Sequence, residues 1–265
     1  MHPIERLRYV ARASGGDQGL IVRETAGALA SLGFDPPGLV TACRRIIERH
    51  PTSGPLWWLA ARVLTAGDPV AEAWRAADEI DADPTARELA HALPDGAAVC
   101  VLGWPEIVGE ALPRRGDLRV LVVDAMDEGS GLVRRLMASD VDVADVPVTG
   151  LGAAASDVQV VLVEASAMGP DGLVAVAGSR AAAAVAHHAG VAVWAVAGVG
   201  RLLPARTWQA VERRVDDGSA EPWELEDEVV PIDLVDQVAG PWGVMPVADA
   251  MRRVDCPVAP ELLRQ

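Results

Sequence analysis

Hydrophobic residues recur with two different periods along the chain. Up to about Leu93 they recur at spacings of three and four residues, which is typical of amphipathic helices. Glycines and prolines separate the expected helices, which are Pro3–Ala13, Gln18–Leu32, Pro37–Glu48, Leu56–Thr65 and Val70–Ile80. We therefore predict a helical N-terminal domain, residues 1–93, in which Trp57, Trp58 and Trp74 occupy the core or helix interfaces.

From Ala97 onward, short valine-rich runs bounded by Gly and Pro replace the helical period. These runs are Val99–Leu102, Val120–Val123, Val141–Val148, Val158–Val163 and Val191–Val196. Helical segments between them are Pro105–Leu112, Gly131–Ser139 and Arg180–Ala189. Strands that alternate with helices indicate βαβ units, so residues 94–265 are predicted to be a Rossmann-like domain with a mainly parallel sheet. The fold class expected for the whole chain is α/β.

The end of the chain has a weaker pattern. Ala205–Val215 is predicted to be a helix, Ser219–Glu228 an acidic loop, and Pro231–Val238 a segment that covers the edge of the sheet. The Ala-rich segment Arg180–Ala189 has high helix propensity and suits a right-handed crossover between the strands on either side of it.

Composition and charge narrow the classes of function. A hydrophobic fraction of 51% is ample for a core, and a net charge of −15 repels nucleic acid and anionic membranes. We expect neither as a direct partner. No apolar run approaches the ~18 residues of a membrane span, and a charged N-terminus indicates a cytoplasmic protein. Three widely spaced cysteines indicate reduced thiols.

The chain contains no lysine and no asparagine, which excludes Schiff-base chemistry and a Walker-type phosphate loop. Gly150–Ala155 has the loose GxGxxA spacing of a dinucleotide site, but too few residues precede the next strand for the usual helix. No cysteine lies in the spacing that zinc requires. No cofactor and no metal are predicted. Each of four Arg-Arg pairs, Arg134–Arg135 among them, is expected on a solvated helix face.

Candidate binding residues follow the predicted strands. Ligands of parallel sheets bind beyond the carboxyl ends of the strands, which would bring Glu164–Ser166, Gly178–Ser179 and Gly198–Arg201 to one edge. Gly178 and Ser179 open a helix whose free N–H groups suit an anion, although Ser179 as a simple N-cap explains them equally well. Arg201 is the nearest candidate arginine for a phosphate or carboxylate. Glu164 adds negative charge to this edge, so a neutral, hydroxyl-rich ligand suits it as well as an anion does. A purely structural edge that binds no ligand explains these residues better than either.

Two further groups are explained more simply by structure than by function. Asp124, Asp127 and Glu128 follow the strand Val120–Val123, where they could hold sugar hydroxyls, but a solvated loop explains them better. His187-His188 lies late in a helix, where positive charge suits the helix dipole, and we expect one histidine to pack and the other to be exposed.

Several motifs in the same order resemble a known family from about Asp17 to the C-terminus. They are the segment His50–Leu56, the strand–loop–helix Cys100–Leu112, Glu164–Ser166, Asp171-Gly172 followed by Gly178-Ser179, and Glu228–Pro231 continuing to Gly243. In this arrangement the chain resembles the regulatory alpha, beta and delta subunits of translation initiation factor 2B and their relative methylthioribose-1-phosphate isomerase. The resemblance implies a helical domain before a Rossmann-like domain, and a homodimer formed through the latter.

The chain departs from the isomerase pattern where the chemistry would be. The resemblance implies a catalytic cysteine near Gly103 and a catalytic aspartate at Ser166, but the chain has Gly103-Trp104 and Ser166 there. It implies Asn-Lys just before Gly178, where Val176-Ala177 stand. His50 and Met126 replace arginines that would help to bind phosphate.

We therefore expect a non-catalytic binding or regulatory protein, with translation as a link by analogy. Its predicted ligand is a nucleotide, sugar phosphate or other hydroxylated molecule in the interdomain cleft. The candidate ligand-binding residues are Gly103, Trp104, Glu164, Ser166, Gly178, Ser179 and Arg201, and no catalytic residue is assigned. The alternative is an isomerase-like enzyme that uses Glu164 as its base.

Overall fold

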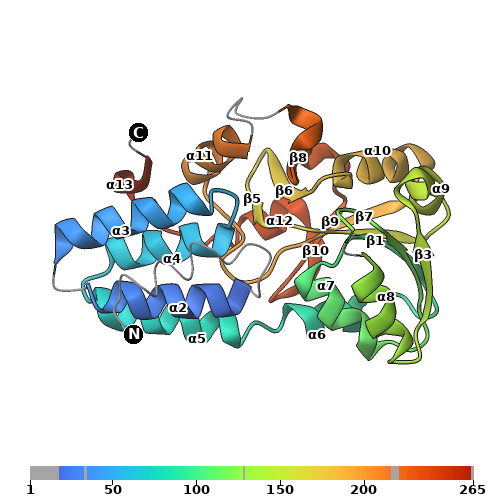
Figure 1. The fold of residues 1–265 in the computed structure, drawn as a ribbon, viewed down its shortest axis with the longest axis horizontal. Helices are drawn as coiled ribbons and strands as arrows, with labels where there is room; N and C mark the ends of the chain where they lie inside the picture. The colour runs from blue at the N-terminus through green and yellow to red at the C-terminus, as the bar shows by residue number, and fades with distance from the viewer. Residues whose placement is uncertain (1–17, 33–34, 128, 216–220, 264–265) are drawn as a thin grey trace.

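The computed structural model describes residues 18–32, 35–127, 129–215 and 221–263. The expected helix Pro3–Ala13 lies outside them. Within the described ranges, four helices form the bundle at one end of the molecule: α2 (Gln18–Ala30), α3 (Pro36–Arg49), α4 (Gly54–Thr65) and α5 (Pro69–Asp81) (Figure 1). Each corresponds to a predicted helix. Prolines stand in the first turns of α3, α4 and α5, where a missing N–H costs no hydrogen bond.

A seven-stranded sheet forms the other end of the molecule. Its order is β10-β9-β7-β4-β1-β2-β3, and all neighbours are parallel except β10, which is antiparallel to β9. The strands are β1 (Ala98–Leu102), β2 (Arg119–Val123), β3 (Asp142–Val146), β4 (Val160–Glu164), β7 (Ala192–Val196), β9 (Gln237–Gly240) and β10 (Gly243–Pro246). The helix-then-parallel-sheet architecture expected from the sequence is therefore confirmed.

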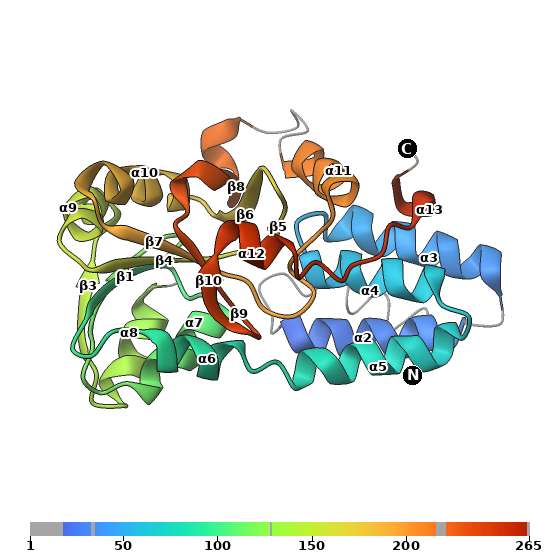
Figure 2. The ribbon, with the colours of Figure 1, turned by 180° about the vertical axis from the view of Figure 1, so that it is seen from behind.

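Helices cover both faces of this sheet (Figures 1 and 2). They are α6 (Thr85–Ala92), α7 (Glu106–Ala111), α8 (Gly129–Met137), α9 (Leu151–Ser156), α10 (Ser179–Ala189) and α12 (Val247–Met251). Short 3-10 turns are η1 (Leu112–Arg114), η2 (Val148–Gly150), η3 (Pro222–Glu224) and η4 (Ile232–Leu234). A helix does form in the GxGxxA segment, as α9, but it has only six residues because β4 follows so soon.

A second, antiparallel sheet was not predicted. It has the order β5-β6-β8, from β5 (Ala167–Met168), β6 (Gly172–Val176) and β8 (Asp227–Pro231). The predicted turn at Gly169–Gly172 is present, and Gly169 N donates to Gly172 O at 2.9 Å. The expected acidic loop Ser219–Glu228 is wrong at its end, because Asp227 and Glu228 pair with β6. The edge of the large sheet is β10 rather than Pro231–Val238, since the β9–β10 hairpin continues the sheet.

The chain returns to the helical bundle at its C-terminus. Helices α11 (Ala205–Val215) and α13 (Pro260–Leu263) lie beside α3 and α4 (Figure 2). Trp208 of α11 shares one buried core with Trp57 and Trp58, and all three are inaccessible to solvent. Trp74 is instead 40% exposed. The division at residues 93 and 94 remains a prediction.

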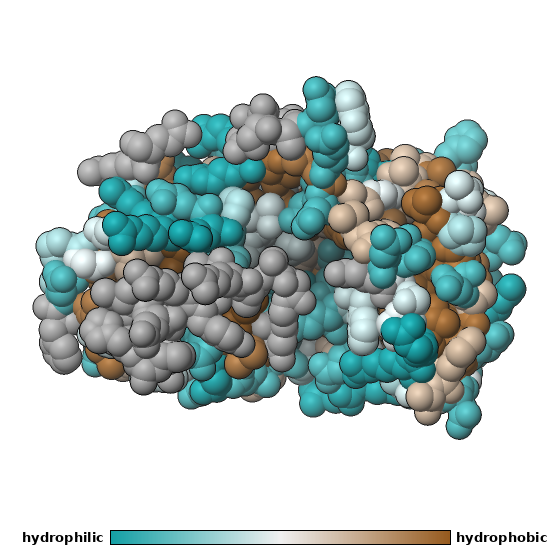
Figure 3. All heavy atoms as spheres, in the orientation of Figure 1, coloured by the Kyte–Doolittle hydropathy of each residue, from teal (hydrophilic) through white to brown (hydrophobic). Residues whose placement is uncertain are grey.

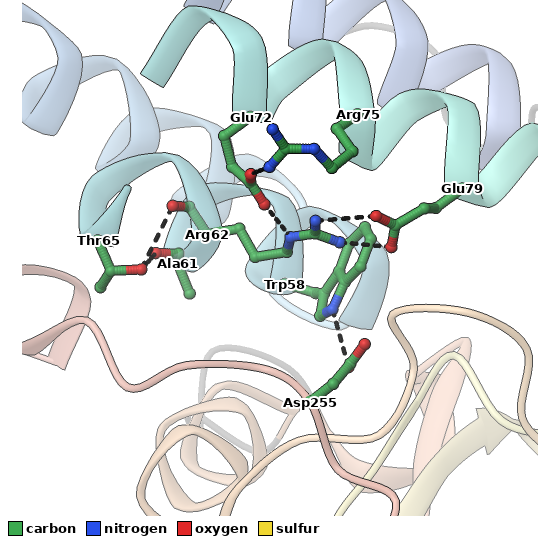
Figure 4. A network of polar contacts seen from close by, with 8 residues as sticks. All are labelled: Trp58, Ala61, Arg62, Thr65, Glu72, Arg75, Glu79 and Asp255. Carbon is green, nitrogen blue, oxygen red and sulfur yellow. Dashed lines mark hydrogen bonds and ion pairs between the residues drawn. The ribbon is translucent and has the colours of Figure 1, made fainter. Parts of the chain in front are cut away.

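A partly buried ionic network ties α4, α5 and the C-terminal segment together (Figure 4). Arg62 donates to Glu72 and, through both terminal nitrogens, to Glu79 at 2.6 and 2.9 Å. Its guanidinium lies 4.3 Å from the ring centroid of Trp58, whose indole N–H donates to Asp255 at 3.0 Å. The C-terminal segment is thus held against α4, whose Trp58 packs against Gly200, one residue before Arg201.

The surface is mixed in polarity. Hydrophilic residues are spread over the face shown in Figure 3, and hydrophobic residues gather at the end where β3 and α9 lie. Met137 and Val148 are both 59% exposed there. The histidine expectation is wrong: His187 and His188 are both exposed, because α10 packs through Ala182, Ala183 and Ala186. Within the described residues, no helix is long and apolar enough to cross a membrane.

Candidate functional site

A cleft of about 1080 Å³ opens at the carboxyl ends of β1 and β4. The chain runs from β1 toward β2 and β3 on one side, and from β4 toward β7 and β9 on the other. Such a point, where the strand order reverses, is where α/β sheets bind their ligands. Gln18 at the start of α2 also lines the cleft, so the helical bundle contributes to its wall.

The cleft brings together six of the seven predicted residues. Its lining includes Gly103, Trp104, Glu164, Ser166, Ser179 and Arg201. The seventh, Gly178, has a positive φ of 96° and is the N-cap of α10, immediately before Ser179. The register of β4 with β7 pairs Glu164 with Val196, which explains why Glu164 and the Gly198–Arg201 loop emerge at one edge. Their role in binding a ligand remains a prediction.

Arg201 and Glu164 face each other as a closed, buried ion pair. Arg201 is 5% exposed, and its Nη1 donates to Glu164 Oε1 at 2.9 Å and to the carbonyl oxygen of Ala165 at 2.8 Å. Its Nη2 donates to Glu106 Oε2 at 3.3 Å. The other oxygen of Glu164 accepts the Val108 N–H of α7 at 2.9 Å. Both carboxylate oxygens of Glu164 are therefore occupied, and Arg201 is already neutralised by protein groups.

The loop before Arg201 is fixed by the helical part of the chain. Asp83 accepts the Val199 N–H at 2.8 Å, and Gly200, with φ +77°, leaves space for the ring of Trp58. Ser166 is fixed in a similar way, because its carbonyl oxygen accepts the N–H of Gly54 at the start of α4 at 2.9 Å. The floor of the cleft is thus positioned by the bundle and not only by the strands.

The start of α10 is partly satisfied from within the chain. Gly178 is the N-cap, so Ser179 is the first helical residue and the N-cap explanation for Ser179 is wrong. The N–H of Arg180 donates to a carboxylate oxygen of Glu228 at 2.8 Å. That carboxylate occupies the position of negative charge that a helix N-terminus favours, which weakens this helix end as a site for a ligand anion.

Further charged residues line the cleft beyond the seven predicted ligand-binding residues. Asp127 and Asp227 line it, together with Arg134 and Arg135 of α8. Asp124 does not line the cleft; it accepts the N–H of Gly129 at the start of α8 at 2.8 Å, so it caps a helix. Glu128 lies outside the described residues. The expectation that Arg134 and Arg135 only solvate a helix face missed their position at the cleft.

The pKa of Asp227 is raised because burial disfavours its charged form. The negative charge of Glu226 raises the pKa further, and a hydrogen bond with Thr52 opposes the shift. Asp227 is therefore the cleft carboxyl whose proton is held more tightly in the folded protein than in the unfolded chain.

The Asp227→Asn variant is expected to melt at a higher temperature than the wild type at pH 7–8. Because the folded state binds this proton more tightly, the ionised carboxylate lowers stability above its raised pKa. That cost disappears as the pH falls through the folded pKa toward the unfolded value of 3.8, so the two proteins should converge near pH 4. Thermal melts across pH would measure this, with exposed Asp233→Asn as control. A destabilised Asp227→Asn at pH 8 would contradict the prediction.

Comparisons with known proteins agree with the fold. Residues 91–221 match the model of the "Initiation factor 2 subunit family". A search of curated protein sequences gave no significant match. The solved structure of the translation initiation factor eIF-2B of Pyrococcus horikoshii OT3 is similar, with a TM-score of 0.76 and 16% identity over 94% of this chain and 98% of that chain.

A subunit in the tetrameric eIF2B-beta2-delta2 complex of Chaetomium thermophilum is also similar, with a TM-score of 0.76 and 18% identity over 94% of this chain and 92% of that one. The eIF2B beta structure of Chaetomium thermophilum has a TM-score of 0.71 and 19% identity, over 98% and 91%. Identities this low show a shared fold alone. The family match covers residues 91–221, and over this part the chain is similar to the initiation factor 2 subunit family.

Proposed function

We propose that this protein binds a small phosphorylated, hydroxyl-bearing ligand in the cleft and acts as a non-catalytic regulatory protein. The proposal rests on one contrast in the cleft. Arg201 is bound to Glu164, whereas the guanidinium groups of Arg134 and Arg135 are available to a ligand. Each carboxylate oxygen of Glu164 already accepts a hydrogen bond from within the protein. Among the described residues, Arg134 and Arg135 form no ion pair and line the cleft, which leaves their guanidinium groups to bind a phosphate.

The lining of the cleft also supports binding without turnover. None of its described residues is a cysteine, histidine or lysine. Cys43, Cys100 and Cys256 are all buried, and burial raises the pKa of each thiol to about 12, which keeps them as unreactive thiols. The described walls thus lack a thiol nucleophile and a histidine or lysine acid, with which an isomerase could stabilise its transition state.

A ligand panel tests this function. Ribose 5-phosphate or adenosine 5′-monophosphate is expected to raise the melting temperature, because a ligand at 100 times its Kd stabilises the folded state by about 2.7 kcal/mol. Arg134→Ala and Arg135→Ala should reduce the effect, whereas Arg213→Ala on α11, outside the cleft, should not. No shift with any phosphate ester at millimolar concentration would overturn the proposal.

One observation keeps an enzyme as the second candidate. Asp227 is a cleft carboxyl with a raised pKa, a property that general acids and bases often have. We expect no turnover of methylthioribose 1-phosphate or ribose 1,5-bisphosphate. Product that forms with the wild type and disappears with Asp227→Asn would make the protein an enzyme and assign its acid or base.

We also propose that the protein forms a homodimer and has a cytoplasmic role. The subunit from Chaetomium thermophilum to which this fold is similar comes from a tetrameric complex, which supports self-association of this chain as a homodimer. A cytoplasmic role connected to translation is supported by the family match and by the initiation-factor structures that share the fold.

A further inference from the structure

Strand β3 ends the parallel sheet on the side away from the helical bundle (Figure 1). Among the described residues, β2 is the only strand that pairs with it. The N–H of Asp124 donates to the carbonyl oxygen of Val146 at 2.9 Å, so Val146 directs its backbone groups toward β2. Alternate residues of a parallel strand turn these groups to opposite sides, so those of Val143 and Asp145 face away from the sheet. Their N–H and carbonyl groups are left for a further strand.

The opposite edge of the sheet is less suited to such pairing. Its strand β10 has four residues and ends at Pro246, which has no N–H to donate. Helix α6 also packs against β10. Strand β3 contains no proline and pairs with β2 residue for residue, without a bulge. Prolines and bulges are common means of blocking an edge strand, and β3 has neither.

Exposed apolar side chains lie at both ends of β3. Met137 at the end of α8 and Val148 just after the strand are each 59% exposed. Between them, Val143 and Val146 are only partly buried, at the margins of the cores on the two faces of the sheet. Figure 3 shows hydrophobic surface gathered at this end of the molecule. A strand laid along β3 would remove part of this apolar surface from water, which favours its binding.

Two carboxylates determine which strand fits this edge. Asp142 and Asp145 are exposed residues of β3, and neither forms an ion pair with another described residue, although Arg119 stands opposite Asp142 in the register. A second copy of β3 would place four carboxylates on one short ladder, and like charges there are destabilising. The net charge of −15 adds to this repulsion. The edge therefore favours a basic partner strand over a second copy of the chain.

We infer that the free edge of β3 binds an extended, basic segment of another protein, which adds to the sheet as a further strand. Hydrogen bonds to the backbone of Val143 and Asp145 supply affinity, and cations opposite Asp142 and Asp145 supply specificity. Because these two carboxylates are three residues apart, the matching segment carries two cations with two apolar residues between them. No residue of β3 lines the cleft, so this inference is independent of the ligand proposed there.

Fluorescence anisotropy tests the inference with labelled peptides that share their flanks and differ in the core, Lys-Val-Val-Lys or Glu-Val-Val-Glu. The wild type is expected to bind the lysine peptide at least ~10-fold more tightly, because two opposite-charge pairs replace two like-charge pairs. The lysine peptide methylated on its core backbone nitrogens should not bind, since it cannot donate to β3. Asp142→Lys combined with Asp145→Lys should reverse the preference, whereas exposed Asp233→Lys should keep it.

The remaining outcomes each overturn the inference. Equal binding of the methylated peptide would mean attraction between charges without strand pairing. An unchanged preference in the double variant would place the peptide elsewhere, and no binding at millimolar protein would leave the edge without this partner. Light scattering examines self-association: a dimer that is lost in Asp145→Pro, which removes an outward N–H, would make a second copy the occupant. Should the double variant not fold, the methylated peptide decides on the wild type.

Discussion

Replacing Arg201 by methionine is expected to lower the free energy of unfolding by about 3–5 kcal/mol, the usual cost of removing one partner of a buried ion pair. The side chains of Arg201 and Glu164 are 6% and 9% exposed. The variant would leave the Glu164 carboxylate buried with only the Val108 N–H, and the carbonyl oxygen of Ala165 would lose its guanidinium partner. Urea denaturation of the two proteins would measure the difference.

A matched pair of variants separates charge burial from a general effect of losing an arginine. Arg114→Met breaks an exposed pair with Glu110 four residues earlier, for which about 0–1 kcal/mol is expected. Arg201→Met combined with Glu164→Gln should recover part of the loss, since no buried charge is then unpaired. A cost below about 1 kcal/mol for Arg201→Met would show that the pair is open, and Arg201 would return as a candidate anion site.

Patterns of local sequence were sufficient to predict most of the elements and the edge at which the cleft lies. Valine-rich runs bounded by glycine predicted β4 and β7, and their parallel pairing brought Glu164 and Arg201 to one side. Whether these two side chains bind a ligand or each other depends on how their rotamers meet in the fold. The sequence states no such contact, and for this reason Arg201 was expected to be open to an anion.

Long-range pairing explains the residues that were missed. Asp227 stood in an acidic stretch with no alternation, and only its antiparallel pairing with Val176 makes it part of a strand at the cleft. The packing of Trp104 against α7 and α8 could have been suspected from the sequence. Gly109 and Gly131, where an added Cβ would meet the indole, are isolated glycines within helical patterns. Such glycines commonly have a packing reason, but the sequence does not show which ring they accommodate.

Replacing Arg62 by methionine is expected to cost on the order of 3 kcal/mol, because it removes the centre of the network in Figure 4. The Arg62 side chain is 14% exposed, and its partner Glu72 is 11% exposed. The variant leaves Glu72 with Arg75 alone and takes the guanidinium away from Glu79 and from the ring of Trp58. It should melt several degrees below the wild type in a thermal scan.

Arg75→Met is the control, because Arg75 binds the same Glu72 from a side chain that is 59% exposed. Exposed pairs contribute about 0–1 kcal/mol, so this variant should unfold close to the wild type. Equal losses of stability in the two variants would contradict the prediction. They would mean that Glu72 is stabilised equally by either arginine and that the burial of Arg62 adds nothing. If the loss is confined to Arg62→Met, the stacked and buried guanidinium joins α4 to α5 and keeps Trp58 in place against Gly200, one residue before Arg201.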